Sequence, residues 1–531
     1  MGFCAGVFIS VSTAMSAFGQ INIGELNPAS VYDAGILQDG SLDSGLWQGV
    51  STVQASNLIN NIDMSATGSA RSLIRAALLS GGVPPQAGDS FEREAYVAAR
   101  LSAVLALGNF SSFDDLVNRS DINRANPVYT KIFVERALLG GDMNSACAMT
   151  DNIITARKSP YWAKLRAFCH VVRNEIPAAE LTADLLVRSG HEDKAFFVLL
   201  GKLTGTRPEI KLASIDTPLQ IAMLGEVLKV DKIDVKTTPL VFTATMALDV
   251  GQDPADRLTA LLAAAHLLDA QQIRSVLASL TDTPPDTLPY PVMEPAEVLA
   301  KKTWDVTTWG GAYLALGSSV NMDSSAALVG ALLAQADKHG QLPAFTQALK
   351  IETGLIPAQY QAKFNLGIFA RAAVLRGDKA VLRGLFQTLE ASDPLRQRIA
   401  LAADALNNGF VFGKLGRDIE TRLAGDGKIK VRAVRDSFIA VAMGAHLSRE
   451  AETVLQQTKL EGRALNPGEF LALQAAARRG SKAEIALRTA HMIDGEPLRA
   501  DAFAALLGVL TRIGMHEQAG KLAALDILTH D

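Results

Sequence analysis

Glycine and asparagine turns recur along this chain at nearly constant intervals, and each turn separates two stretches that have the apolar periodicity of a helix. Successive turns are 33 residues apart in the first half of the chain and 32 to 36 residues apart in the second half. The turn positions are Gly108, Gly141 and Asn174, then Gly377, Gly409, Gly444, Gly480 and Gly514. Glycine at such a position lets a helix end in the left-handed conformation. A period near 34 residues predicts an array of antiparallel helix hairpins.

The clearest hairpin spans residues 364–394, and its second helix has a continuous apolar stripe. The stripe follows the i, i+1, i+4, i+5, i+8 pattern of an amphipathic helix and consists of Val381, Leu382, Leu385, Phe386 and Leu389. One hairpin cannot bury such a stripe alone, whereas stacking on the next hairpin can. We therefore expect an all-α protein of stacked hairpins.

The same unit resembles the tetratricopeptide-like superfamily. The resemblance depends on Leu366-Gly367, the turn Gly377-Asp378, the small residue Ala380 and the closing Pro394. It implies a right-handed α-solenoid and a role in binding other proteins, without a ligand motif that can be transferred.

Composition agrees with helices packed on helices. Hydrophobic residues make up 48% of the chain and aromatic residues only 6%, and small apolar residues suit close helix packing. The 51 basic and 55 acidic residues leave a net charge of −4. A general nucleic-acid binder needs a clustered basic surface, so we expect no nucleic-acid partner.

The predicted helices are interrupted or preceded by irregular stretches, and one of these stretches divides the array into two lobes. Five prolines between Pro284 and Pro295 predict a stiff connector over residues 281–296. The connector separates an N-terminal helical lobe, 50–280, from a C-terminal lobe, 297–531. Residues 20–49 should be extended or disordered, either as a tether or folded onto the helices or a partner. Residues 79–85 form a third irregular loop.

The N-terminus has features of a signal peptide over residues 1–19. Residues 3–15 are mainly apolar, and Ala17-Phe18-Gly19 before Gln20 fits a signal-peptidase site. The apolar run is too short to span a membrane, so no integral span is expected. No Lys or Arg precedes the run, which leaves a buried N-terminal segment or a different start codon as alternatives.

Two of the three cysteines lie one predicted hairpin apart. Removal of a leader would remove Cys4 and leave Cys147 and Cys169. Cys147 lies on the apolar side of a predicted helix over 144–157, and Cys169 lies on that of a second helix beginning at Pro160. At ~1.5 Å per residue the two reach nearly the same height, which predicts a disulfide in an oxidising compartment. The alternatives are two buried free cysteines or a metal site. We expect a mature protein that begins near Gln20 and has no free thiol.

Motifs of known chemistry are absent from the sequence. There is no nucleotide-binding P-loop, H-E-x-x-H, C-x-x-C or G-x-S-x-G, and the eight histidines are scattered. We therefore assign no catalytic, cofactor-binding or metal-binding residue. Trp304 and Trp309, just after the connector, either line a partner-binding groove or seal a core between the lobes.

These observations favour an exported, periplasmic scaffold or adaptor that binds other cell-envelope proteins, for example in a motility, secretion or cell-wall assembly. Two alternatives remain at this point. One is a helical support for an envelope enzyme that acts on peptidoglycan. The other is a cytoplasmic regulator of the same fold.

Overall fold

The computed structural model is helical throughout the residues that it describes. These residues are 30–37, 41–42, 45–108, 110–124, 126–153, 158–206, 212, 214–229, 239–281, 295–319, 321–391, 393–406, 415–425 and 427–529. They form 29 α-helices and one 3₁₀ helix without a strand among them, which confirms the predicted all-α class. The predicted signal peptide, residues 20–29 and most of the proline-rich connector lie outside the described residues.

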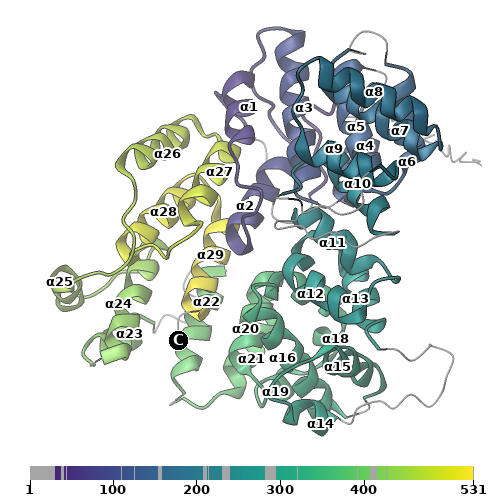
Figure 1. The fold of residues 1–531 in the computed structure, drawn as a ribbon. Helices are drawn as coiled ribbons and strands as arrows, with labels where there is room; N and C mark the ends of the chain where they lie inside the picture. The colour runs from purple at the N-terminus through teal and green to yellow at the C-terminus, as the bar shows by residue number, and fades with distance from the viewer. Residues whose placement is uncertain are drawn as a thin grey trace, which may run out of the picture.

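Thirteen of the α-helices precede the connector, and most pack against the next helix in antiparallel pairs (Figure 1). They are α1 (Thr52–Asn60), α2 (Gly68–Leu79), α3 (Ser90–Ala106), α4 (Phe110–Asn118), α5 (Pro127–Leu139), α6 (Met143–Asp151), α7 (Pro160–Val172), α8 (Ile176–Arg188), α9 (Lys194–Leu203), α10 (Pro218–Leu228), α11 (Leu240–Leu248), α12 (Pro254–Ala264) and α13 (Ala270–Ala278), with the 3₁₀ helix η1 (Ala265–Leu267) after α12.

The remaining helices follow the connector. They are α14 (Pro295–Ala300), α15 (Val306–Ser318), α16 (Met322–Lys338), α17 (Leu342–Ala348), α18 (Lys350–Leu355), α19 (Ala358–Gln361), α20 (Leu366–Arg376), α21 (Lys379–Thr388), α22 (Pro394–Leu406), α23 (Leu415–Leu423), α24 (Gly427–Ala442), α25 (Arg449–Gln457), α26 (Pro467–Arg479), α27 (Lys482–Ile493), α28 (Ala500–Arg512) and α29 (His516–Thr529).

The turn positions expected from the repeat have left-handed backbone wherever they are described. Gly377 ends α20 with φ 69° and Gly480 ends α26 with φ 77°. Positive φ also occurs at Gly108, Gly141, Asn174, Gly444 and Gly514. Gly409 lies outside the described residues. Because residues with a Cβ rarely adopt this conformation, the turn residues fix where each hairpin reverses.

The helices on either side of the connector contact each other directly. Both α13 and η1 pack against α17, and α13 also packs against α15. The backbone N–H of His266 in η1 donates to Oε1 of Gln341, which precedes α17, over 3.0 Å. The two halves of the array are therefore joined by packed helices.

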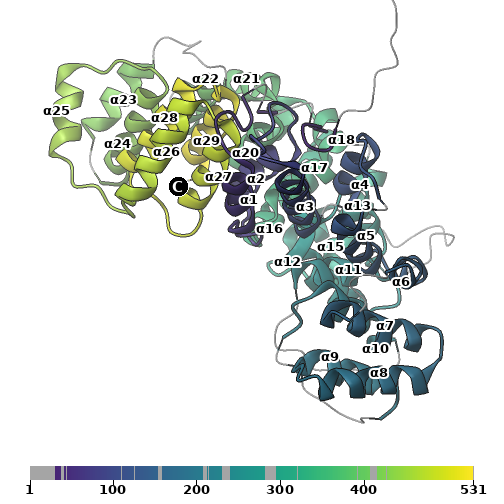
Figure 2. The ribbon, with the colours of Figure 1, turned by 90° about the horizontal axis from the view of Figure 1, so that it is seen from above.

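The two ends of the array also meet. Helix α2 packs along α27, and α1 touches α27 as well, so the first helices lie beside the last ones in both ribbon views (Figures 1 and 2). Farther along, α29 packs against α20 and α22. These contacts go beyond the neighbour-to-neighbour packing that we expected from a solenoid. The described chain follows a closed circuit.

The described part of the N-terminal segment packs onto the helices rather than forming a tether. The described residues of this segment, 30–37, 41–42 and 45–50, run beside the irregular stretch 79–86. The backbone N–H of Ile36 donates to the carbonyl of Leu79 over 2.9 Å, and that of Trp47 donates to the carbonyl of Val83 over 3.0 Å. A Cβ on Gly35 would lie only 1.9 Å from the backbone nitrogen of Gly81. The two irregular stretches of the sequence therefore stabilise each other.

A buried arginine joins these two stretches. Arg100 on α3 is 1% exposed, and its guanidinium donates to four backbone carbonyls over 2.7 to 3.0 Å. The acceptors are Leu78 and Ser80, at the end of α2, and Val31 and Ala34. Because the last carbonyls of a helix lack partners within that helix and carry partial negative charge, they suit a buried cation.

The N-terminal segment then reaches the other end of the chain. The N-cap residue of α27, Ser481, makes no side-chain capping bond. The first N–H groups of α27 instead donate to the N-terminal segment, from Lys482 to the carbonyl of Gly45 over 3.2 Å and from Ala483 to that of Leu46 over 2.8 Å. Capping satisfies donors that have no partner within the helix. Residues 45–46 thus tie the beginning of the chain to α27.

Replacing the buried arginine should destabilise the protein strongly. In Arg100→Met the four carbonyls lose their donors, so we expect the free energy of unfolding to fall by at least about 3 kcal/mol in urea denaturation. The control is Arg188→Met on the exposed end of α8, which should change it by less than about 0.5 kcal/mol. Equal effects of the two substitutions would contradict this role for Arg100.

Candidate functional site: a groove between the chain ends

A groove lies where the two ends of the chain meet, and we call it the junction groove. It consists of two adjoining cavities of about 170 and 430 Å³. Residues of α1, the α1–α2 loop and α2 line one side, and residues of α26, α27 and the turn after α27 line the other. Both cavities share Leu58, Asn61 and Arg488. The groove exists only because distant parts of the sequence are packed together.

Local sequence signals fix the helices that form its walls. Helix α1 begins at a capping box in which Ser51 and Gln54 bond each other's backbone N–H groups. Helix α26 begins with Asn466 as N-cap and Pro467 in its first turn, and it ends at Gly480. The contact of α2 with α27 then sets the separation of α1 and α26.

The floor of the groove is apolar. Ala66, Ile74, Leu487, Ala490 and Met492 are each at most 5% exposed. These side chains belong to the core between α2 and α27, so the floor is part of the packed interface that closes the array.

One end of the groove is rich in carboxylates. Asp63, Glu469 and Asp494 line the smaller cavity together with His491. His491 Nε2 lies 3.4 Å from Glu469 Oε1, an ion pair when the imidazole is protonated. Hydrogen bonds from the Ser65 hydroxyl and backbone N–H lower the pKa of Asp63, which keeps this carboxylate charged.

The other end of the groove contains a buried carboxylate between two arginines. The side chain of Glu484 is 4% exposed, and its two oxygens accept from Arg479 over 2.7 Å and from Arg488 over 2.9 Å. Opposite them, α1 contributes the amide side chains of Gln54 and Asn57 to the larger cavity. One carboxylate between two guanidinium groups leaves this end with one surplus positive charge.

This arrangement suits binding. A groove with an apolar floor, charged rims and amides that both donate and accept hydrogen bonds can hold a polypeptide segment. Among the described residues, no group of three or more His, Cys, Asp or Glu side chains is arranged to hold a metal ion.

Two buried titratable groups elsewhere have pKa shifts that burial explains. Burial lowers the pKa of His266 to about 4, with Arg71 adding repulsion and Gln341 opposing the shift. Burial raises the pKa of Asp436, against the effect of its partner Arg422 at 2.7 Å. Neither group lines the junction groove, and we assign neither a chemical role.

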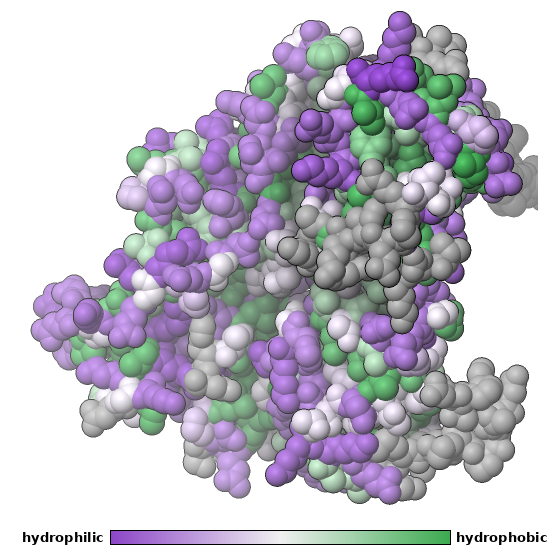
Figure 3. Space-filling model, viewed as in Figure 1, coloured by the Kyte–Doolittle hydropathy of each residue, from purple (hydrophilic) through white to green (hydrophobic). Residues whose placement is uncertain are grey.

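Two other grooves flank α11, but neither is the better candidate. Their cavities measure about 380 and 620 Å³, and α5 contributes to both. Both adjoin α11, which directly follows residues 230–238, outside the described part of the chain. On the face seen in Figure 3, hydrophilic and hydrophobic side chains are intermixed rather than gathered into one broad apolar patch. We take the junction groove as the candidate site because it combines an apolar floor with charged rims.

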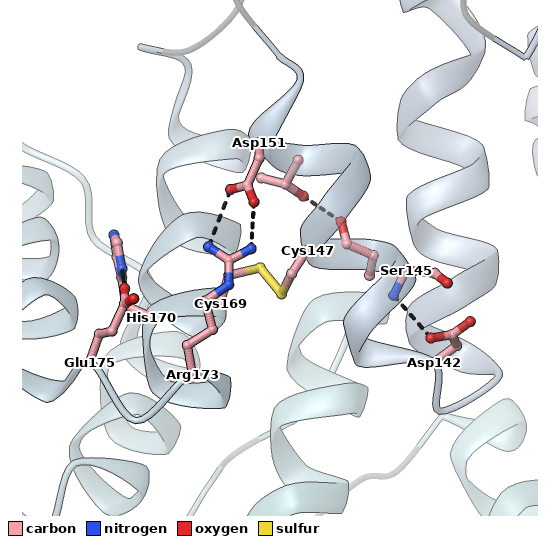
Figure 4. Close-up of a disulfide and its surroundings, with 10 residues drawn as sticks. Asp142, Ser145, Cys147, Asp151, Cys169, His170, Arg173 and Glu175 are labelled. Atoms are coloured by element: carbon pink, nitrogen blue, oxygen red, sulfur yellow. Dashed lines mark hydrogen bonds and ion pairs between the residues drawn. A yellow bond between two sulfur atoms is a disulfide. The ribbon is translucent and has the colours of Figure 1, made fainter.

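The predicted cysteine pair forms a disulfide between α6 and α7 (Figure 4). The Cα atoms of Cys147 and Cys169 are 5.5 Å apart, and both residues are buried. An ion pair between Asp151 and Arg173 joins the same helices next to the bridge. The first helix is shorter than we expected: it ends at Asp151 rather than at Arg157, because Asn152 caps it.

The two predicted partner-binding tryptophans differ in accessibility. Trp309 is 2% exposed and packs against Phe345 with the ring centroids 5.5 Å apart. Trp304 is half-buried and meets Trp309 edge to face at 5.3 Å. Trp309 thus belongs to the core of the structure, and a role in sealing the two lobes stays a prediction. Partner binding by Trp304 stays a prediction.

The sequence did not reveal the junction groove. The turn at Gly480 was visible as a helix boundary, but no pattern in one sequence links residues 57–63 to residues 469–494. The pairing depends on the N-terminal segment, whose low periodicity predicted little structure.

No family model matches this chain, and neither a curated protein nor a solved structure is significantly similar to it. The resemblance to the tetratricopeptide-like superfamily therefore stays a prediction. Within the described part of the chain, none of the helices has both the length and the apolar character required to cross a membrane.

The disulfide should contribute measurably to stability. A bridge that closes 22 residues stabilises a protein by about 3 kcal/mol in the chain-entropy model. We expect the double variant Cys147→Ser, Cys169→Ser to lose about this much free energy of unfolding in urea denaturation, and to be insensitive to added reductant. Two titratable thiols in the native, non-reduced protein, with stability unchanged by reductant, would contradict this assignment.

Proposed function

We propose that this protein is an exported helical scaffold or adaptor, and that the junction groove holds a segment of a partner protein in the cell envelope. In this proposal the hairpins form a right-handed, tetratricopeptide-like superhelix whose ends are tied together. The observation that carries the proposal is the groove itself, with its apolar floor, its charged rims and its walls from both ends of the chain.

The size and chemistry of the groove favour a polypeptide ligand. Its two cavities adjoin, so an extended segment can contact both. Asn57 is exposed on α1 and faces the small side chains Ala472 and Ala475 across the larger cavity. Small residues on one wall leave room for a main chain, and amides on the other can both donate to and accept from peptide groups.

Export is supported by the disulfide. Buried bridges of this kind persist in oxidising compartments and are rare where thiol systems keep cysteines reduced. Cys147 and Cys169 pair within one hairpin, so the bridge needs no cysteine from a partner chain, and the compartment supplies the oxidant. The leader-like residues 1–19 agree with this location.

Photo-cross-linking in the native host tests the proposal. A photoreactive amino acid in place of Asn57, on the groove wall, should yield one dominant cross-linked envelope protein, because the groove places this side chain against the partner. The matched control carries the same amino acid in place of Glu452, an exposed residue of α25, and should not yield that product.

The proposal would be wrong if the product formed equally from both positions, or if the position of Asn57 captured nothing while the protein was intact and correctly folded. Fractionation of the same cells adds a second readout. The cross-linked product should be found with the envelope.

A further inference from the structure

We propose that the acidic end of the junction groove takes a lysine or arginine side chain of an extended partner segment. This inference rests on the proposed function, because it specifies the chemistry of the segment that the groove holds.

The charges around the smaller cavity are predominantly negative. Its rim has three carboxylates, Asp63, Glu469 and Asp494, against one imidazole, His491, and one guanidinium, Arg488. Arg488 is already engaged by the buried Glu484, which lies outside the smaller cavity. A cation from a partner would therefore be attracted, and an anion repelled.

The carboxylates are available to such a cation. Among the described residues, the Asp63 carboxylate is hydrogen-bonded within its own turn, where Ser65 donates to it from its hydroxyl over 2.6 Å and from its backbone over 2.8 Å. Asp63 is exposed, and the side chain of Glu469 is 38% exposed. Each carboxylate has two oxygens with about four lone-pair sites, and the second oxygen of Asp63 can accept hydrogen bonds from an ammonium or a guanidinium group.

The shape of the cavity fits the same type of side chain. Beneath the carboxylates lies the apolar floor that includes Ile74, Leu487 and Met492, in a cavity of about 170 Å³. Lysine and arginine have an aliphatic stem that packs on apolar surface and a charged head that stays at a polar rim. A purely apolar side chain would offer the carboxylates no donor, and a small cation would not use the floor.

The opposite end of the groove sets the direction of the segment. Arg479 and Arg488 share the single carboxylate Glu484, so that end has surplus positive charge. Charges of opposite sign at the two ends of one groove favour a single orientation of a bound segment. In that orientation its basic side chain lies near Asp63 and Asp494.

Peptide binding to the full-length protein tests this inference. The probes are fluorescein-labelled peptides of alanine, glycine and serine that are identical except for one central residue, which is Lys, Arg, norleucine or Glu. We expect fluorescence anisotropy to give dissociation constants about 10-fold lower for the Lys and Arg peptides than for the norleucine peptide, with the Glu peptide weakest. Added salt should reduce the difference.

The double variant Asp63→Asn, Asp494→Asn should remove the preference for the basic peptides, whereas the control Glu452→Gln, an exposed acid on α25, should leave it intact. Circular dichroism verifies that the variants are folded. Equal affinity for all four peptides, tighter binding of the Glu peptide, or no binding of any peptide would overturn the inference.

The peptide-binding test and the cross-linking test can fail separately, so the two proposals can be told apart. Capture of an envelope protein from the position of Asn57, without a preference for basic peptides, would overturn this inference and leave the proposed function standing. A preference for basic peptides without any captured protein would overturn the proposed function.

Discussion

The arrangement of the molecule depends on one buried cation. Arg100 donates to carbonyls at the end of α2 and in residues 31–34, and this contact holds an irregular N-terminal segment against the helical array. The segment then continues to residues 45–46, whose carbonyls cap α27. These contacts add to the direct packing of α2 along α27, and together they position the two walls of the junction groove.

The physical basis of this contact is hydrogen bonding to partial charges rather than ion pairing. A buried guanidinium is costly unless its donors are satisfied, and Arg100 is satisfied by four carbonyls without a carboxylate bonded to it. Packing supports the same contact, because Tyr96, one turn earlier on α3, is fully buried between the rings of Tyr32 and Trp47. The segment is thus fixed by polar and aromatic contacts from the same helix face.

Much of the local structure could be predicted from the sequence, whereas the closure could not. The turns at Gly377 and Gly480 and the hairpin with Cys147 and Cys169 depend on residues that are close in sequence or follow a helical period. The closure depends on residues such as Gly45 and Lys482, which are joined by a main-chain hydrogen bond that leaves no side-chain pattern. Residues 20–49 were expected to be extended or disordered because their sequence has little apolar periodicity. Periodicity does not reveal the contacts that Trp47 and the backbone carbonyls of this segment make.

The central claim is that the two ends of the chain are closed on each other in solution. The most direct test is a distance measurement by electron paramagnetic resonance, with spin labels at Asn57→Cys on α1 and Ala475→Cys on α26, two positions that line the same cavity. Cys147 and Cys169 remain in their disulfide and are not labelled, and Cys4 is replaced by Ser so that it takes no label. Closure predicts a single narrow distribution at short distance. A broad distribution that extends to long distances would contradict the account, because α1 and α26 would then move independently.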